Sequence, residues 1–124
     1  MSEYTDVLEF HKKFGCHIGE KPGFPSTEEE ELKLRLVVEE YEELLLGIIH
    51  RDLAEIADAI IDLKYVLNGM AISYGIDLDP LWVAVQETNM AKEGGSTRGD
   101  GKILKPKGWV APDIKGLLDK QRSK

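Results

Sequence analysis

Apolar side chains recur at helical spacing in four stretches of the chain, separated by short segments rich in Gly and Pro. The first stretch, residues 3 to 15, carries Val7, Phe10 and Phe14 on one side of a helix, and Gly15 favours its end. A spacing of three or four residues is typical of a helix that buries one face against its neighbours. This pattern predicts an all-α protein.

The second and third stretches are the longest and predict two helices joined as a hairpin. Ser26 and Thr27 each precede a glutamate by three residues, which is the form of a capping box. The second helix should therefore begin there and run to about Leu46. Asp52 can cap the third helix, which should end before Gly75.

A fourth helix and the chain length complete the expected fold. Asp79 at the N-cap and Pro80 at the first helical position favour a helix through Lys92. Four helices with short joints predict an antiparallel four-helix bundle. Because 124 residues are the size of one domain, we expect a single domain with a helical core over about residues 3 to 93.

The remaining segment, residues 94 to 124, is irregular and rich in Gly and Lys. The stretch "STRGDGKILKPKGWVAPD" has too many Gly and Pro residues for a helix. It predicts a short hairpin around Asp100 and Gly101 or an ordered flap, before a last short helix at about residues 114 to 121. We expect this segment to act either as a substrate flap or as a structural strap.

Charge is distributed unevenly along the chain. The formal net charge of -7 argues against general nucleic-acid binding. Residues 28 to 62 hold 12 Asp and Glu, whereas residues 92 to 124 hold nine Lys and Arg. A metal-chelated polyphosphate would suit both regions, because its cation attracts carboxylates and its remaining oxygens attract Lys or Arg. Solvated helix faces and a solvated tail would show the same charges.

Cysteine usage and hydropathy bear on the cellular setting. Cys16 is the only cysteine and cannot form an internal disulfide. The chain starts without a cationic stretch followed by an apolar one, and charges interrupt every apolar run well before the roughly 20 residues of a membrane span. We therefore expect a cytoplasmic protein that binds neither membranes nor nucleic acid.

Two groups of carboxylates lie inside the most apolar part of the chain. They form one stripe on each long helix: Glu39, Glu40 and Glu43 on the second, and Glu55, Asp58 and Asp62 on the third. In a helical hairpin the stripes can face each other, which would gather four to six carboxylates in one cleft. Mg²⁺ and Mn²⁺ prefer such all-oxygen ligand sets.

The alternative is that these acids lie on exposed faces and pair with Lys or Arg. A ferritin-like di-iron centre is excluded, because no histidine follows a glutamate at the Glu-x-x-His spacing. The embedding of both acid pairs among apolar residues favours metal binding over a solvated face.

The order of the carboxylates resembles that of a known family. "EEYEE" followed by "EIAD" resembles the EExxE…ExxD signature of the all-α nucleoside triphosphate pyrophosphohydrolases, the MazG and phosphoribosyl-ATP pyrophosphohydrolase group. The blocks "LRLVVEEYEEL", "DLAEIADAIIDLKYVLNGMAISYGIDL", "ETNMAK" and "DGKILKPKGWVAPDI" are similar to small stand-alone MazG-like proteins. This resemblance covers most of residues 5 to 115.

The resemblance implies Mg²⁺-dependent hydrolysis of a canonical or modified nucleoside triphosphate to the monophosphate and pyrophosphate. The implied metal ligands are Glu40, Glu43, Glu55 and Asp58, with Mn²⁺ as an alternative ion. Asp62 is a further ligand, a supporting group or a partner for Lys64 or another basic residue. Glu39, beside the ligands, is the candidate for orienting or deprotonating the attacking water, with an ordinary surface glutamate as the alternative.

The same resemblance bears on the substrate. "NMAK" implies that Asn89 contacts the base or sugar and that Lys92 meets a phosphate. Arg98, Lys102 and Lys105 lie on the expected flap, where they can either close over phosphates or stay solvated. Phosphoribosyl-ATP itself is less favoured, because the MazG-like blocks extend beyond the acid signature. The alternative in another class is a non-catalytic helical oligomerisation or nucleotide-binding module.

The two long helices are apolar on more sides than a monomeric four-helix bundle can cover. This predicts a homodimer or a dimer of dimers, with the active cleft near or across the subunit interface, as the resemblance also implies.

Overall fold

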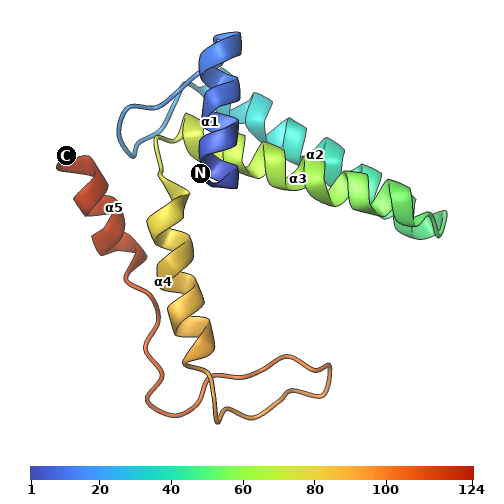
Figure 1. Cartoon of the computed structure of the whole chain (residues 1–124), viewed down its shortest axis with the longest axis vertical. Coiled ribbons are helices and arrows are strands. Elements are labelled where there is room, and N and C mark those ends of the chain that lie inside the picture. The colour runs from blue at the N-terminus through green and yellow to red at the C-terminus, as the bar shows by residue number, and fades with distance from the viewer. The chain divides into compact units, whose positions relative to one another are not determined.

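The computed structural model describes all 124 residues and contains five helices and no strand, which confirms the all-α prediction. The helices are α1 (Glu3–Phe14), α2 (Thr27–Ile49), α3 (Leu53–Ser73), α4 (Leu78–Met90) and α5 (Ile114–Arg122) (Figure 1). They fall into two compact units, Met1–Leu78 and Asp79–Lys124. None of the helices is long and apolar enough to cross a membrane. The single domain and the four-helix bundle stay predictions.

The first unit is built on an antiparallel hairpin of α2 and α3, and α1 packs against α3 (Figure 1). The hairpin was predicted, but α2 extends past Leu46 to Ile49. Gly47 lies inside this helix. A Cβ at this position would lie only 3.1 Å from the Ile56 nitrogen. Its missing side chain therefore allows α2 and α3 to approach closely beside their joint.

The predicted caps are found at the starts of α2 and α3. The Ser26 hydroxyl oxygen accepts a hydrogen bond from the Glu29 N–H at 3.2 Å. The Asp52 Oδ1 accepts hydrogen bonds from the N–H groups of Ala54 and Glu55, at 3.0 and 3.2 Å. These bonds satisfy N–H groups that have no partner within their own helix.

The predicted start and end of α4 are each wrong by two residues. The helix begins at Leu78, so Asp79 lies in its first turn rather than at the N-cap, and it ends at Met90 rather than Lys92. Pro80 is tolerated there because the first N–H groups of a helix need no intrahelical acceptor. The carboxylate of Asp79 still complements the positive end of the helix dipole.

Polar side chains fill the junction of α1, α2 and α3. His11, Lys33 and Ser73 are 3 %, 7 % and 2 % exposed. The Lys33 ammonium lies 3.7 Å from a Glu29 carboxylate oxygen, which also accepts a hydrogen bond from the Ser73 hydroxyl. The Nδ1 atom of His11 lies 2.9 Å from the His17 carbonyl oxygen. These contacts hold one end of the hairpin in register and leave its middle for the carboxylate stripes.

The second unit contains α5 and most of α4, joined by residues 91–113. Within this segment Thr97 bridges Ile103, and the Arg98 N–H donates to the Lys102 carbonyl at 2.7 Å. Gly101 turns the chain with a φ of +93°, a conformation that glycine adopts readily. The structure therefore contains the short hairpin that was one of the two alternatives for this segment, and α5 confirms the predicted last helix.

Candidate active site

The α2–α3 hairpin brings three of the predicted carboxylates together. Glu40 and Glu43 project from α2 and Asp62 from α3, and one oxygen of each lies within 4.8 Å of the others. We refer to these three residues as the carboxylate cluster. The predicted convergence of the two acid stripes is confirmed for these members.

The electrostatics of the cluster disfavour negative charge on two of its members. Burial raises the pKa of Glu40 above its ordinary value, and the neighbouring Glu43, Asp62 and Asp58 raise it further. Burial also raises the pKa of Asp62, with added contributions from Asp58 and Glu43. Each of these carboxylates is therefore less stable in its ionised form than an isolated one in water.

One oxygen of the cluster fits a metal ligand in particular. The Oε2 atom of Glu40 is buried and accepts no hydrogen bond. A buried acceptor without a partner is unfavourable, and a cation in contact with it would relieve both this cost and the mutual repulsion of the carboxylates. Three carboxylates are also a suitable partial ligand set for a hard divalent cation, which completes its coordination with water or substrate oxygens.

The other carboxylates of the two stripes take different positions. Asp58 is exposed but lies near enough to raise the pKa of both Glu40 and Asp62. The Oε2 atom of Glu55, nearer the hairpin joint, lies 3.4 Å from Nδ1 of His50. Glu39 is exposed beside Glu40 on α2. The structure thus places Asp62 in the cluster and gives Glu55 a histidine neighbour.

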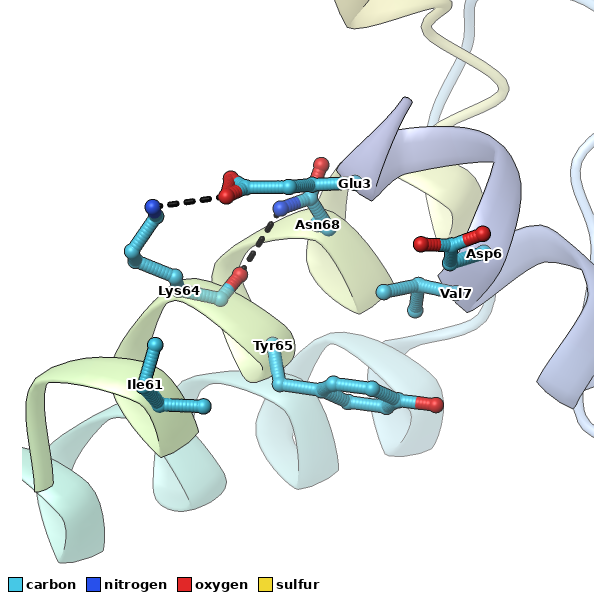
Figure 2. A pocket seen from close by; sticks show the side chains of 7 residues that line it. All are labelled: Glu3, Asp6, Val7, Ile61, Lys64, Tyr65 and Asn68. Carbon is cyan, nitrogen blue, oxygen red and sulfur yellow. Dashed lines mark hydrogen bonds and ion pairs between the residues drawn. The ribbon is translucent and has the colours of Figure 1, made fainter. Parts of the chain in front are cut away.

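A hollow of about 220 Å³ lies between α1 and α3. It is lined by Glu3, Asp6, Val7, Ile61, Lys64, Tyr65 and Asn68 (Figure 2). The Lys64 ammonium pairs with Glu3 at 2.7 Å, and the Asn68 amide donates to the Lys64 carbonyl at 2.9 Å. The suggested pairing of Asp62 with Lys64 is therefore wrong, because Lys64 projects toward α1. None of the predicted site residues lines this hollow.

In the second unit, two predicted phosphate-binding lysines meet at one aromatic ring. The Lys92 and Lys105 ammonium nitrogens lie 5.3 and 5.0 Å from the centre of the Trp109 ring. The Trp109 Nε1–H donates to the Thr88 carbonyl oxygen at 2.6 Å. Asn89 is exposed in the last turn of α4. This grouping of the lysines was not expected from the sequence.

Arg98 differs from these lysines because it has a carboxylate partner. Its Nε and Nη2 donate to the two carboxylate oxygens of Asp100 at 2.9 and 2.6 Å. This pair raises the pKa of Arg98 and lowers the pKa of Asp100, which also accepts from the Lys102 N–H at 3.2 Å. Part of the donor capacity of Arg98 is thus already used within the hairpin.

The fold and the carboxylate cluster are those of an all-α protein that can bind a divalent cation through oxygen ligands between two helices. The model of the phosphoribosyl-ATP pyrophosphohydrolase family matches residues 7–89, more than half of the chain, and the chain belongs to this family. No curated protein matches it. Family membership indicates nucleotide pyrophosphohydrolase activity, which in this family is usually metal-dependent. The match includes both acid stripes and Asn89, whereas Lys92 and the later basic residues lie beyond it.

Proposed function

We propose that the protein is a Mg²⁺-dependent pyrophosphohydrolase that converts a canonical or modified (d)NTP to the monophosphate and pyrophosphate. The observation that carries this proposal is the buried, unpartnered oxygen of Glu40 within the carboxylate cluster. The cluster lies inside the residues matched by the family. Mn²⁺ is the alternative ion, because it accepts the same oxygen ligands.

The proposed metal ligands are Glu40, Glu43, Asp58 and Asp62, with Glu55, beside His50, as a group that supports them. The cation, when bound, would neutralise phosphate charge and lower the pKa of a bound water. The exposed carboxylate of Glu39 is the proposed base, which accepts a proton from the water that attacks the α-phosphorus. The bond between the α-phosphorus and the bridging oxygen then breaks, and pyrophosphate leaves with that oxygen.

The proposed substrate contacts come from the second unit. Asn89 would contact the base or sugar, and Lys92 and Lys105 would contact phosphate oxygens. Lys102 is exposed on the hairpin and could do the same, whereas Arg98 would first have to share its donors between Asp100 and the substrate.

Phosphoribosyl-ATP is a second candidate substrate, because the matching family is described by hydrolysis of this compound. The family match supports it as well as it supports other nucleoside triphosphates, despite the sequence-based preference for the latter. Both substrates would react at the same phosphoanhydride bond and release pyrophosphate, so the chemistry assigned to the carboxylates does not depend on this choice.

We also propose a homodimer or a dimer of dimers, in the cytoplasm. Only four apolar residues are buried in the single chain, namely Val7, Ala59, Ala71 and Ile72. Large apolar side chains on α2 and α3 are exposed, including Ile49 at 70 %, Leu53 at 82 % and Ile61 at 59 %. Burial of such side chains against a second copy would be favourable at about 25 cal/mol per Å² of apolar surface. Light scattering at micromolar concentration that gives the mass of a monomer would contradict this assembly.

The function is tested by measuring pyrophosphate release from a panel of canonical and modified (d)NTPs and from phosphoribosyl-ATP. Each substrate is assayed with Mg²⁺, with Mn²⁺ and with EDTA. We expect release from at least one substrate with metal and none with EDTA. If nucleotides bind but no substrate releases pyrophosphate, the non-catalytic nucleotide-binding module is the better description.

A further inference from the structure

Trp109 is held in a defined position at the end of α4. Its Nε1–H donates to the Thr88 carbonyl oxygen at 2.6 Å, and its backbone N–H donates to the Pro106 carbonyl at 3.1 Å. The residue is half-buried, although the segment around it has no regular secondary structure. The indole is therefore fixed both to α4 and to its own loop.

Two positive charges gather at this ring. Lys92 follows α4, whereas Lys105 lies 13 residues further along the chain, and both ammonium groups are within 5.3 Å of the ring centre. The negative face of an indole attracts a cation, with a free energy of about 0.5 to 1 kcal/mol at an exposed site. Neither lysine forms an ion pair with a carboxylate. The indole thus offsets part of the repulsion between the two ammonium groups.

The contact with an aromatic ring leaves the lysine donors free. Each ammonium has three N–H groups. A carboxylate partner would accept hydrogen bonds from them, whereas the aromatic ring attracts the charge without occupying these donors. Arg98, in the same segment, instead donates two hydrogen bonds to Asp100. Lys92 and Lys105 are therefore better prepared than Arg98 to donate to an incoming anion.

We propose that Trp109 is a positioning residue that holds Lys92 and Lys105 as one pair for the polyphosphate of the substrate. This inference rests on the proposed pyrophosphohydrolase function and adds to it the residue that orders the lysines. Holding two flexible side chains at one ring before binding reduces the entropy lost when both contact the phosphates. The pair would donate hydrogen bonds to phosphate oxygens of the substrate.

The competing explanation is that Trp109 only straps the segment to α4. A strap needs the Nε1 hydrogen bond and the apolar bulk of the side chain, but it does not need an aromatic face beside the lysines. Trp109→Phe keeps an aromatic face and loses the hydrogen bond. Trp109→Leu keeps an apolar side chain but loses both the aromatic face and the hydrogen bond. The two explanations therefore predict different orders for these variants.

The experiment titrates inorganic tripolyphosphate into the full-length, metal-free protein and its variants by calorimetry. We expect Trp109→Leu to weaken binding about fivefold and Trp109→Phe to weaken it less than about twofold. Lys105→Met should weaken binding less in the Trp109→Leu background than in the wild type, because the pair is already disordered there. Lys107→Met removes an exposed charge in the same segment and serves as the matched control.

Several outcomes would overturn the inference. These are unchanged binding by Trp109→Leu, equal weakening by the Leu and Phe variants, additive effects of Trp109→Leu and Lys105→Met, or no binding by the wild type. In a nucleotide assay, Trp109→Leu should raise KM about fivefold and change kcat less than about twofold, whereas a change confined to kcat would contradict the positioning role. Tripolyphosphate binding that depends on Trp109, in a wild-type protein that releases no pyrophosphate, would contradict the proposed hydrolase alone.

A measurement on the wild-type protein keeps the inference testable if Trp109→Leu does not fold. In NMR spectra, the protons on Cε of Lys92 and Lys105 should be shifted upfield by the indole ring current. Their chemical shifts should change when tripolyphosphate is added. Proton shifts typical of solvated lysines, or resonances that do not respond to tripolyphosphate, would overturn the proposal.

Discussion

The two units of the chain hold like charges together in opposite ways. In the first unit, Glu40, Glu43 and Asp62 converge on a helical hairpin without a basic side chain paired to them, and the pKa values of Glu40 and Asp62 are raised. In the second unit, Lys92 and Lys105 gather in an irregular segment, but an indole ring lies beside both. The first cluster lacks a compensating partner, whereas the second has one within its own unit.

This difference indicates what each unit can bind. Like charges held close together without compensation bind an opposite charge strongly, because binding removes repulsion as well as adding attraction. Charges that are already partly compensated bind more weakly and can release their ligand. This difference supports the proposal that the carboxylates bind the metal and that the lysines make the weaker phosphate contacts.

The largest expected effect follows from removing a charge from the carboxylate cluster. Glu40→Gln or Asp62→Asn should lower metal-dependent turnover by about 100-fold or more, because each removes a proposed ligand. The helical content measured by circular dichroism should not change. Glu42→Gln, on an exposed position of the same helix, is the matched control and should retain activity. Near-wild-type turnover in both cluster variants would contradict the assignment.

A smaller effect is expected at Glu55, where the family resemblance and the structure differ. The resemblance implies a ligand, whereas the structure gives Glu55 a His50 neighbour at 3.4 Å. Glu55→Gln should therefore lower turnover only about tenfold, as expected for a group that supports the ligands. A loss as large as that of Glu40→Gln would make Glu55 a direct ligand and would enlarge the cluster toward the hairpin joint.

Without metal, neutralising the cluster should stabilise the protein. Since the folded state raises the pKa of Glu40, the cluster contributes most to stability below the ordinary glutamate pKa, and this contribution is lost as the pH rises through the raised value. In EDTA at neutral pH, Glu40→Gln should raise the free energy of unfolding by about 1 kcal/mol. Urea denaturation should show this gain shrinking toward pH 4. A destabilised variant at neutral pH would mean that the carboxylates do not repel each other.

The smallest expected effect concerns His11 in the polar junction. Burial lowers its pKa, and the positive charge of Lys33 lowers it further, although the His17 carbonyl and the Glu29 carboxylate act in the other direction. Its contribution to stability is therefore complete above the ordinary histidine pKa and is lost as the pH falls below it. His11→Gln should flatten the fall in thermal stability between about pH 7.5 and about pH 5.5. An unchanged pH dependence would exclude His11 as its source.

Local sequence signals predicted most of the helices. The caps at Ser26 and Asp52 have short-range chemistry that does not depend on the rest of the fold, and they marked the starts of α2 and α3 correctly. The predicted end of α2 at about Leu46 was too early, because Gly47 continues the helix and allows a close approach to Ile56 on α3. Such contacts across a hairpin are not visible in the spacing of one helix.

The candidate site was predicted in part for the same reason. Helical spacing identified both acid stripes, but the register of α2 against α3 decides that Asp62, rather than Glu55, meets Glu40 and Glu43. The meeting of Lys92 and Lys105 at Trp109 depends on the path of an irregular segment, for which no periodic signal exists. The spacing of Asp58 and Asp62, four residues apart, was the signal that could have ranked Asp62 higher.

The carboxylate cluster is proposed to bind a divalent cation. Mn²⁺ titrated into the wild-type protein and into the Glu40→Gln/Asp62→Asn double variant, and followed by electron paramagnetic resonance, tests this claim most directly. We predict that the wild type removes free Mn²⁺ from solution at a defined stoichiometry and that the folded double variant does not. Equal Mn²⁺ binding by both proteins, or none by the wild type, would show that the carboxylate cluster is not a cation-binding site.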